Sequence, residues 1–338
     1  MPSRPDTQRV LVTGAAGFIG AHLCRRLLAD GHEVWGLDNF SAYYDVALKE
    51  HRWADLSRSP HFRGARADIT DRDAIESAFA DAKPGAVVHL AAQAGVRYSL
   101  KAPRTYLSVN IDGTFEVADA CVRHGVGHLV LSSTSSAYGA RETVPFRERD
   151  ASAHPVSLYA ATKLSAEAIL HSQSHLHALP VSALRFFTVY GPEGRPDMAP
   201  YLFTDAILNG RPIKVFNRGD MARDFTFIDD LVEAILRIMA VSPGDAPVSP
   251  RDSLSPVAPF RTINIGQSTP VPLMAFIRAI EATTGTTARM NLLPMQPGDV
   301  RITHADPTLL RELTGYVPAT PVEDGVARYV DWFQGYYA

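Results

Sequence analysis

The chain has 338 residues, which is enough for one large α/β unit or for two lobes around a substantial core. A net charge of −3 at pH 7 argues against a general nucleic-acid binder and against a protein held on an anionic membrane surface. No apolar run approaches membrane-spanning length, and the 2 cysteines make no disulfide framework, so we expect a cytoplasmic protein.

A strand, a glycine-rich turn, a helix and a second strand open the chain. The first strand covers residues 9–13, and the second, residues 32–38, ends in Asp38. Glycines let the backbone approach a pyrophosphate, whose charge meets the amide groups at a helix N-terminus. A carboxylate at Asp38 accepts hydrogen bonds from adenosine ribose hydroxyls and repels a 2′-phosphate, so this unit predicts NAD rather than NADP. The cofactor contacts predicted here are Gly14, Gly17, Phe18, Ile19, Gly20, Asp38 and Asn39.

The alternation of strands and helices continues to residue 187. Further strands are predicted over residues 62–68, 86–92, 128–136 and 180–187, with a helix capped by Asp71 and another over residues 109–123. This order predicts an α/β fold with a parallel, doubly wound (Rossmann) sheet, whose ligands lie beyond the carboxyl ends of the strands. The further cofactor contacts predicted at these ends are Asp68, Ile69, Leu90, Ala91, Ala92 and Asn110. We expect Asn110 to stand at a helix start near the nicotinamide and to matter for geometry more than for chemistry.

Past Tyr190 the pattern loosens. Residues 191–197 form a turn-rich loop, and residues 242–259, rich in Pro, Ser and Asp, predict an exposed insertion. Helices are expected over residues 201–209, 274–284 and 320–333, and a strand over residues 262–265. We therefore predict an NAD-binding Rossmann domain over residues 1–186, to which residues 224–240 and 261–267 return. Residues 187–223 and 268–338 form a smaller α/β substrate-binding lobe.

A tyrosine and a lysine lie one helical turn apart in residues 157–163. Free tyrosine titrates at about pH 10, and a nearby ammonium group lowers that pKa because it favours the phenolate. Tyr159 and Lys163 can then take a proton from a secondary alcohol while a nicotinamide takes the hydride. This spacing is common on solvated helix faces. The glycine turn and Thr134, which ends a predicted strand and can reach the same sugar hydroxyl, argue against a chance occurrence, so we predict Thr134, Tyr159 and Lys163 as catalytic residues, the last two also contacting the cofactor.

With these features the chain resembles the extended short-chain dehydrogenase/reductases, and within them the NAD-dependent nucleotide-sugar epimerases and dehydratases. The resemblance runs from Val10 to Trp332, and its most specific segments are residues 90–97, 185–192, 194–198, 223–225 and 296–300. This set looks most like the UDP-glucuronate 4-epimerases. The resemblance implies a UDP-sugar substrate, a tightly held NAD and oxidation of the sugar at C4.

Several reactions share that first oxidation. In the 4,6-dehydratases an Asp-Glu pair follows the catalytic threonine, and UDP-glucuronate decarboxylases have a Glu in the corresponding segment. Here Ser135 and Ser136 follow Thr134, and hydroxyls cannot replace carboxylates as general acid and base at neutral pH. We therefore expect reversible C4 epimerisation of UDP-glucuronate to UDP-galacturonate. The alternatives are a UDP-glucose/UDP-galactose 4-epimerase, a decarboxylase or dehydratase, and an NAD-binding sensor of the same fold without turnover.

The resemblance also implies the substrate contacts. We expect Arg223 on the diphosphate, Phe216 stacked on uracil and Asp299 on the ribose. Arg195 can hold the uronate carboxylate with two hydrogen bonds, and neutral donors can follow that carboxylate as the ring turns. The complete predicted set is Arg97, Ser135, Ser136, Thr188, Arg195, Val215, Phe216, Arg223 and Asp299.

Three histidines, His171, His175 and His177, stand at near-helical spacing. Since no cysteine or acidic residue accompanies them in the same turn, we expect a solvated helix face and no metal site. Members of the resembled family form dimers through paired helices, and residues 115–121 and 164–170 are the matching stretches. We therefore expect a homodimer.

Overall fold

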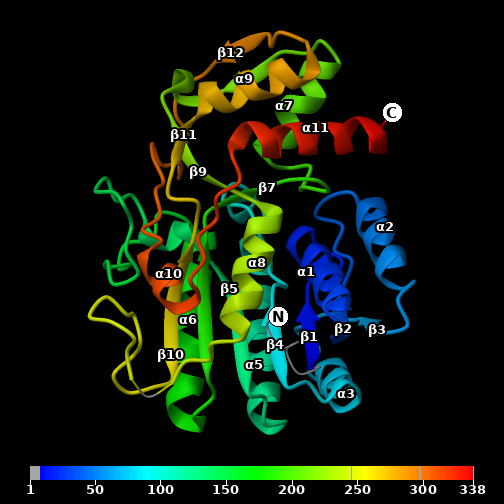
Figure 1. Ribbon diagram of the computed structural model, residues 1–338, viewed down its shortest axis with the longest axis vertical. Coiled ribbons are helices and arrows are strands. Elements are labelled where there is room, and N and C mark those ends of the chain that lie inside the picture. Colours follow the sequence, from blue (N-terminus) through cyan, green and yellow to red (C-terminus); the bar gives the residue numbers. More distant parts are fainter. Residues whose placement is uncertain (1–7, 245, 297, 338) are drawn as a thin grey trace.

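The structure, a computed structural model, describes residues 8–244, 246–296 and 298–337. Within this part of the chain, seven strands form one parallel sheet in the order β10-β6-β5-β4-β1-β2-β3 (Figure 1). The strands are β1 (Arg9–Thr13), β2 (Glu33–Asp38), β3 (Phe62–Arg66), β4 (Ala86–His89), β5 (His128–Thr134), β6 (Val181–Phe186) and β10 (Phe260–Ile265). The order reverses between β1 and β4, so the predicted doubly wound sheet is confirmed.

Helices cover both faces of this sheet, because successive residues of each strand point to opposite sides. On β1, Val10 and Val12 join one core with α1 (Phe18–Ala29) and α8 (Ile228–Met239), and α2 (Val46–Leu56) lies beside α1. Leu11 joins the opposite core with α3 (Arg72–Ala82), α5 (Gly113–Arg123) and α6 (Leu158–His177). The side chain of Asp71 caps α3 as predicted, accepting a hydrogen bond from the Ala74 amide at 3.1 Å.

The smaller lobe lies across one end of the sheet, at the top of Figure 1. It contains α7 (Ala199–Leu208), α9 (Leu273–Thr284) and α11 (Val322–Tyr337), a three-stranded sheet and a two-stranded sheet. The strands are β7 (Thr188–Tyr190), β9 (Ala222–Phe227) and β11 (Pro270–Pro272), and β8 (Ile213–Val215) with β12 (Met290–Leu292). Stacked rings of Phe225 and Phe276, with centroids 4.2 Å apart, join β9 to α9 in the lobe's core.

Two boundaries of the lobe differ from the prediction. β9 pairs with β7 through Thr188 and Phe225, so the chain returns to the large domain at Ile228, where α8 begins, rather than at residue 224. The helix α10 (Thr308–Thr314), assigned by sequence to the lobe, instead packs on α8 and β10. Its Leu309 and Leu310 are buried there, and this apolar pair explains the placement.

The predicted insertion, residues 242–259, is irregular but not uniformly exposed. Asp252 is fully buried and accepts hydrogen bonds from Arg261 of β10 at 2.8 and 2.9 Å. His171 and His175 of α6 contact the same segment, at Ser255 and Val257. The prediction of an exposed segment is therefore wrong at Asp252, because the segment covers an edge strand whose backbone would otherwise be open.

Some predictions fall on positions outside the described residues. These are the first seven residues of the predicted large domain, Asp245 of the insertion, Pro297 of the segment at residues 296–300, and Ala338 at the end of the predicted lobe. In the described part of the chain, no helix is long and apolar enough to span a bilayer. Among the same residues, no three His, Cys, Asp or Glu side chains gather closely enough to hold a metal ion.

Candidate active site

A cavity of about 1200 Å³ lies between the carboxyl ends of the sheet strands and the smaller lobe. Two of the residues predicted to bind cofactor or substrate, Asn110 and Val215, do not line it. All the others do, and so do the three predicted catalytic residues. Residues from segments scattered over the sequence thus meet in one space, as expected where parallel strands end at a common edge.

The glycine turn forms a close-fitting wall of this cavity. Gly14 has φ +74°, and a Cβ atom there would lie 2.8 Å from the Ala91 amide nitrogen. A Cβ on Gly20 would overlap the carbonyl oxygen of Gly14. Helix α1 starts directly after the turn, and no side chain among the described residues caps its first amides. The backbone therefore offers uncapped N–H donors at a helix N-terminus, which suits a pyrophosphate.

Asp38 lies beside this turn at the end of β2. Its carboxylate accepts hydrogen bonds from the amides of Ala16 at 3.0 Å and Phe40 at 2.8 Å. Burial raises the pKa of Asp38, although Lys49 and the two amides oppose that effect. Each carboxylate oxygen keeps a second lone pair for a ribose hydroxyl. The turn and Asp38 together fit the adenosine and diphosphate parts of NAD.

The predicted adenine contacts lie at the end of β3. Asn39 donates a hydrogen bond to Asp68 at 2.7 Å, and the Thr70 amide donates to the same carboxylate at 2.9 Å. Ile69 is buried against α5, where a Cβ on Gly113 would lie 2.7 Å from the Ile69 side chain. The protein's own contacts therefore hold this segment in place without a bound adenine.

Tyr159 and Lys163 lie on the first turns of α6, whose N-cap Ser157 accepts a hydrogen bond from the Ala160 amide at 3.1 Å. Lys163 is only 2% exposed, and burial lowers its pKa to about 8 although Glu167 raises it. Burial also raises the pKa of Tyr159, with the Thr134 hydroxyl and Arg195 opposing it. The net shift of the Tyr159 pKa is therefore upward, opposite to the predicted lowering, because burial outweighs the groups that favour the phenolate.

A buried ion pair behind Lys163 was missed from the sequence. Glu167, one turn further along α6, accepts hydrogen bonds from Arg185 of β6 at 3.0 and 2.7 Å and another from the Ser133 hydroxyl. The guanidinium of Arg185 also lies 4.8 Å from the ring centre of Tyr138. The spacing of Glu167 four residues after Lys163 places both on one helix face, which is the signal that could have revealed it.

Asn110 does not stand at the start of a helix as predicted. The helical segment begins earlier, with α4 (Pro103–Leu107), and Asn110 lies in a π-helical turn, Ser108–Asp112, before α5. Its side chain accepts from the Gln93 amide at 2.8 Å and donates to the Gln93 carbonyl and the Thr162 hydroxyl, both at 3.0 Å. The oxygen and both N–H groups of the amide are engaged, so Asn110 positions the segment after β4 rather than touching a ligand in the cavity.

On the substrate side, Ser135 and Ser136 form a 3₁₀ turn after β5, where the Thr134 hydroxyl accepts from the Ser136 amide at 3.1 Å. Thr188 is the first residue of β7 and also faces the cavity. Val215, by contrast, is fully buried in the core at the end of β8. Its predicted substrate contact is therefore not supported, because its side chain packs inside the lobe.

The residues predicted to hold the nucleotide lie together. The guanidinium of Arg97 is 4.8 Å from the ring centre of Phe216 and 3.4 Å from Asp299. Arg223 approaches the same carboxylate at 3.4 Å. Burial lowers the pKa of Arg223, opposed by Asp299. This cluster presents two cations and an aromatic ring to one region of the cavity, which suits a nucleoside diphosphate.

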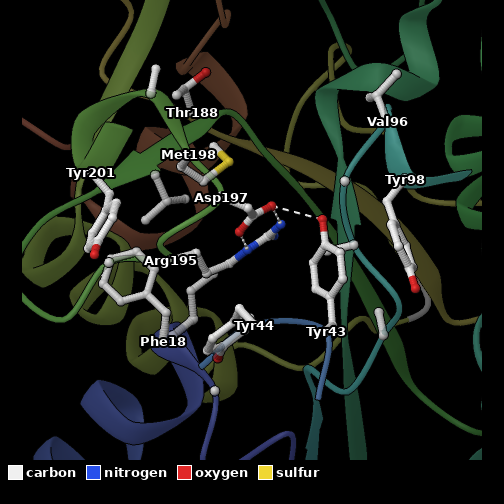
Figure 2. Close-up of a pocket in the computed structure, with 18 of the residues that line it drawn as sticks. Phe18, Tyr43, Tyr44, Val96, Tyr98, Thr188, Arg195, Asp197, Met198 and Tyr201 are labelled. Atoms are coloured by element: carbon white, nitrogen blue, oxygen red, sulfur yellow. Dashed lines mark hydrogen bonds and ion pairs between the residues drawn. The ribbon is translucent and has the colours of Figure 1, made fainter. Parts of the chain in front are cut away.

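Arg195 reaches the cavity from the loop between β7 and α7 (Figure 2). Its Nε and Nη2 donate to Asp197 at 3.0 and 2.5 Å, and the Tyr43 hydroxyl donates to the same carboxylate at 2.8 Å. The sequence predicted Arg195 but neither of these partners. Tyr43 comes from the loop after β2, so this contact joins the two parts of the molecule.

The chain is similar to known proteins in sequence and in structure. A "Probable UDP-glucuronate 4-epimerase" from Rhizobium meliloti (strain 1021) is 50% identical over 97% of this chain and 98% of its own length. A crystal structure of UDP-glucuronic acid 4-epimerase from Bacillus cereus with UDP-glucuronic acid and NAD has a TM-score of 0.87 at 32% identity, covering 97% of this chain and 99% of that one. A UDP-glucose 4-epimerase structure from Thermotoga maritima, with UDP-glucose, gives 0.85 at 29% identity, over 97% and 99%.

These likenesses extend over the whole arrangement of sheet, lobe and cavity. The model of the NAD dependent epimerase/dehydratase family matches residues 10–248, which include the glycine turn, Asp38, Thr134, Tyr159 and Lys163. Since the match covers more than half of the chain and the cavity walls fit NAD, the chain belongs to the NAD dependent epimerase/dehydratase family.

Proposed function

We propose that the chain is a UDP-glucuronate 4-epimerase, which interconverts UDP-glucuronate and UDP-galacturonate with a tightly bound NAD. The observation that carries this proposal is that Arg195 lines the same cavity as Tyr159 and Lys163. A guanidinium in that place can recognise the carboxylate that distinguishes a uronate from a hexose. The names of the relative from R. meliloti and of the structure from B. cereus support the same activity.

Bound NAD supplies an acceptor, and later a donor, for the hydride at C4 of the sugar. Tyr159 takes the proton of the C4 hydroxyl and returns it after the 4-keto sugar has turned, assisted by Thr134. Because burial raises the pKa of Tyr159, the phenolate needs the positive charge of Lys163. Lys163 keeps that charge below its pKa of about 8, so we expect the reaction to depend on a protonated lysine.

Ser135 and Ser136 favour epimerisation over elimination. Both line the cavity directly after Thr134, where a dehydratase needs a general acid and base. Serine hydroxyls can donate hydrogen bonds to the uronate carboxylate, but without an activating group they cannot replace carboxylates as general acid and base at neutral pH. The oxidised sugar is therefore left to accept its hydride back on the other face.

The test is to incubate the purified protein with UDP-glucuronate, without added NAD, and to follow the sugar by proton NMR. We expect the C4 isomer to accumulate until both forms are at equilibrium. A UDP-pentose would indicate decarboxylation, and turnover of UDP-glucose but not of UDP-glucuronate would indicate the hexose epimerase. Tyr159→Phe should abolish turnover while NAD stays bound, and unchanged activity would contradict the role of Tyr159.

Replacing Arg195 tests the substrate assignment separately. Arg195→Ala should weaken uronate turnover far more than any turnover of UDP-glucose, because only the uronate offers a carboxylate to the guanidinium. An equal effect on both sugars would remove this assignment. NAD content, measured on the same samples, reports whether the cofactor site has stayed intact.

We also propose a cytoplasmic homodimer that pairs through α5 and α6, which pack against each other. Cys121 and Leu170 of the two predicted stretches are buried in the core, whereas Phe115 is 41% exposed on α5. A partner chain placed over α5 would cover this apolar ring. Light scattering should give the mass of two chains for the wild type and of one chain for Phe115→Glu. A wild type with the mass of one chain would contradict the proposal.

A further inference from the structure

Arg195 does not face the cavity as a free cation. Two of its N–H groups, on the edge formed by Nε and Nη2, donate to the two oxygens of Asp197. Figure 2 shows this pair with the Tyr43 hydroxyl directed at the same carboxylate. The side chains of Arg195 and Asp197 are 20% and 28% exposed, so solvent screens the pair only in part.

The pairing leaves one end of the guanidinium available. Arginine has five N–H donors in a fixed planar fork, and Asp197 takes one from Nε and one from Nη2. Among the described residues, no hydrogen bond from Nη1 is found, whereas the Tyr43 hydroxyl also lies within hydrogen-bonding reach of the guanidinium. A second carboxylate can therefore approach the Nη1 end of the guanidinium while Asp197 stays in place.

Asp197 is charged and firmly held. Burial alone would raise its pKa, but the charge and hydrogen bonds of Arg195 outweigh burial and lower it. Burial and Asp197 raise the pKa of Tyr43 to about 12, so Tyr43 remains a hydrogen-bond donor at neutral pH. The Tyr43 ring is itself fixed by Tyr98, with ring centres 4.6 Å apart.

We propose that Asp197, held by Tyr43, is a positioning residue that limits the grip of Arg195 on the uronate carboxylate. The inference rests on the proposed function and deepens it. An epimerase must let the ring turn, so the carboxylate must leave its partners and be bound again in a new orientation. A partly buried arginine without a counter-charge would hold a carboxylate tightly in one orientation. Asp197 fixes the plane of the guanidinium and offsets part of its positive charge. The direction of the hydrogen bonds then contributes more to recognition of the carboxylate than net attraction does.

Asp197→Asn tests this inference, because it removes the charge and keeps the volume and an acceptor oxygen. We expect binding of UDP-glucuronate to the NAD-loaded protein to tighten by about tenfold, while binding of UDP is unchanged and kcat falls. A merely structural role would not produce this opposition between Kd and kcat. Tyr43→Phe should shift both quantities in the same directions by a smaller factor, since it removes only the donor that holds Asp197.

Asp220→Asn is the matched control. Asp220 accepts from Nε and Nη2 of Arg301 at 3.0 and 3.1 Å, the same fork geometry, but the pair is exposed and does not line the cavity. This variant should leave the binding of UDP-glucuronate and kcat unchanged. In an Arg195→Ala background, Asp197→Asn should no longer tighten binding, because it acts through the guanidinium.

The outcomes separate the inference from the proposed function. If the wild type does not epimerise UDP-glucuronate, the proposed function fails and the inference fails with it. If the wild type is active but Asp197→Asn binds UDP-glucuronate equally or more weakly, only the inference fails, and Asp197 then does no more than orient Arg195. Tighter binding that persists without Arg195 would also overturn it.

Discussion

Replacing Lys163 by methionine should make the protein more stable and inactive. Lys163 is 2% exposed, and burial lowers its pKa from the ordinary 10.5 to about 8. At about 1.4 kcal/mol for each tenfold change, that fall means that holding the buried ammonium costs about 3 kcal/mol of folding free energy. Methionine has a similar length and no charge, so it removes this cost and fills the same space.

The fall in the Lys163 pKa is a net value that already includes the attraction between Lys163 and Glu167. Glu167 keeps its two hydrogen bonds from Arg185 in the variant, so we expect a net gain of about 3 kcal/mol at pH 7. For a chain of this length that corresponds to a rise in Tm of about 2–5 °C. Turnover should be lost, because the ammonium group is gone and Arg195, which still favours the Tyr159 phenolate, is paired with Asp197.

The change of folding stability with pH is a second, independent test of whether the charge of Lys163 destabilises the fold. Between pH 8 and 10.5 the unfolded chain carries a proton on this lysine that the folded chain has released. The stability of the wild type should therefore rise with pH through this window, relative to Lys163→Met. The gap between the two proteins should be largest below pH 8 and should close as pH approaches 10.5.

Urea denaturation at pH 7 and pH 10, with and without saturating NAD, measures both effects. Lys83→Met, a change at an exposed lysine at the end of α3, is the control and should alter stability by less than about 0.5 kcal/mol. A Lys163→Met protein that is less stable than the wild type at pH 7 would refute the reasoning. It would mean that the fold fully compensates the buried charge.

Three further changes test other parts of the structure. Glu167→Gln leaves the buried guanidinium of Arg185 without its carboxylate, so urea denaturation should show a loss of about 3–5 kcal/mol; a loss below about 1 kcal/mol would contradict the buried pair. Gly20→Ala overlaps the backbone of the glycine turn and should remove the NAD absorbance of the purified protein. Gly335→Ala should retain it, because a Cβ there meets no atom of the described residues within 4 Å. Asp252→Asn breaks the ion pair that holds residues 242–259 on the sheet edge, so limited proteolysis should cleave this segment faster, and unchanged cleavage would show that other contacts hold it.

Short sequence patterns predicted many features of the fold. The glycine turn, Asp38 and the cap at Asp71 each follow from a few neighbouring residues, and each has its predicted place. The strands were predicted too long at their carboxyl ends: residues 128–136 were expected to be extended, yet β5 ends at Thr134 and the serines form a 3₁₀ turn. A run of small and hydroxyl residues is compatible with a strand or with a 3₁₀ turn. The neighbouring strand decides where β5 ends, because β6 pairs with it only as far as Phe186.

What the sequence did not reveal are contacts between distant residues. Tyr43 bonds to Asp197 across 154 positions, and no local pattern links them. The rise in the Tyr159 pKa has the same origin, since it depends on how much of the folded protein surrounds the phenol. The pairing of Glu167 with Arg185 could have been predicted only in part. Glu167 lies at helical spacing from Lys163, but Arg185 lies on the next strand.

The cavity treats its binding cations and its catalytic cation differently. Arg195 is paired with Asp197, and Arg97 and Arg223 share Asp299, so the cations predicted to meet the substrate are partly neutralised and can exchange partners with little change in net charge. Lys163 is attracted by Glu167, but the two oxygens of that carboxylate already bind Arg185. The positive charge of Lys163 is therefore only partly compensated and destabilises the fold. This division suits a reaction in which the sugar must turn while one phenol is activated repeatedly. A strong uncompensated cation near the uronate would impede the turn, whereas full compensation at Lys163 would leave the buried Tyr159 protonated.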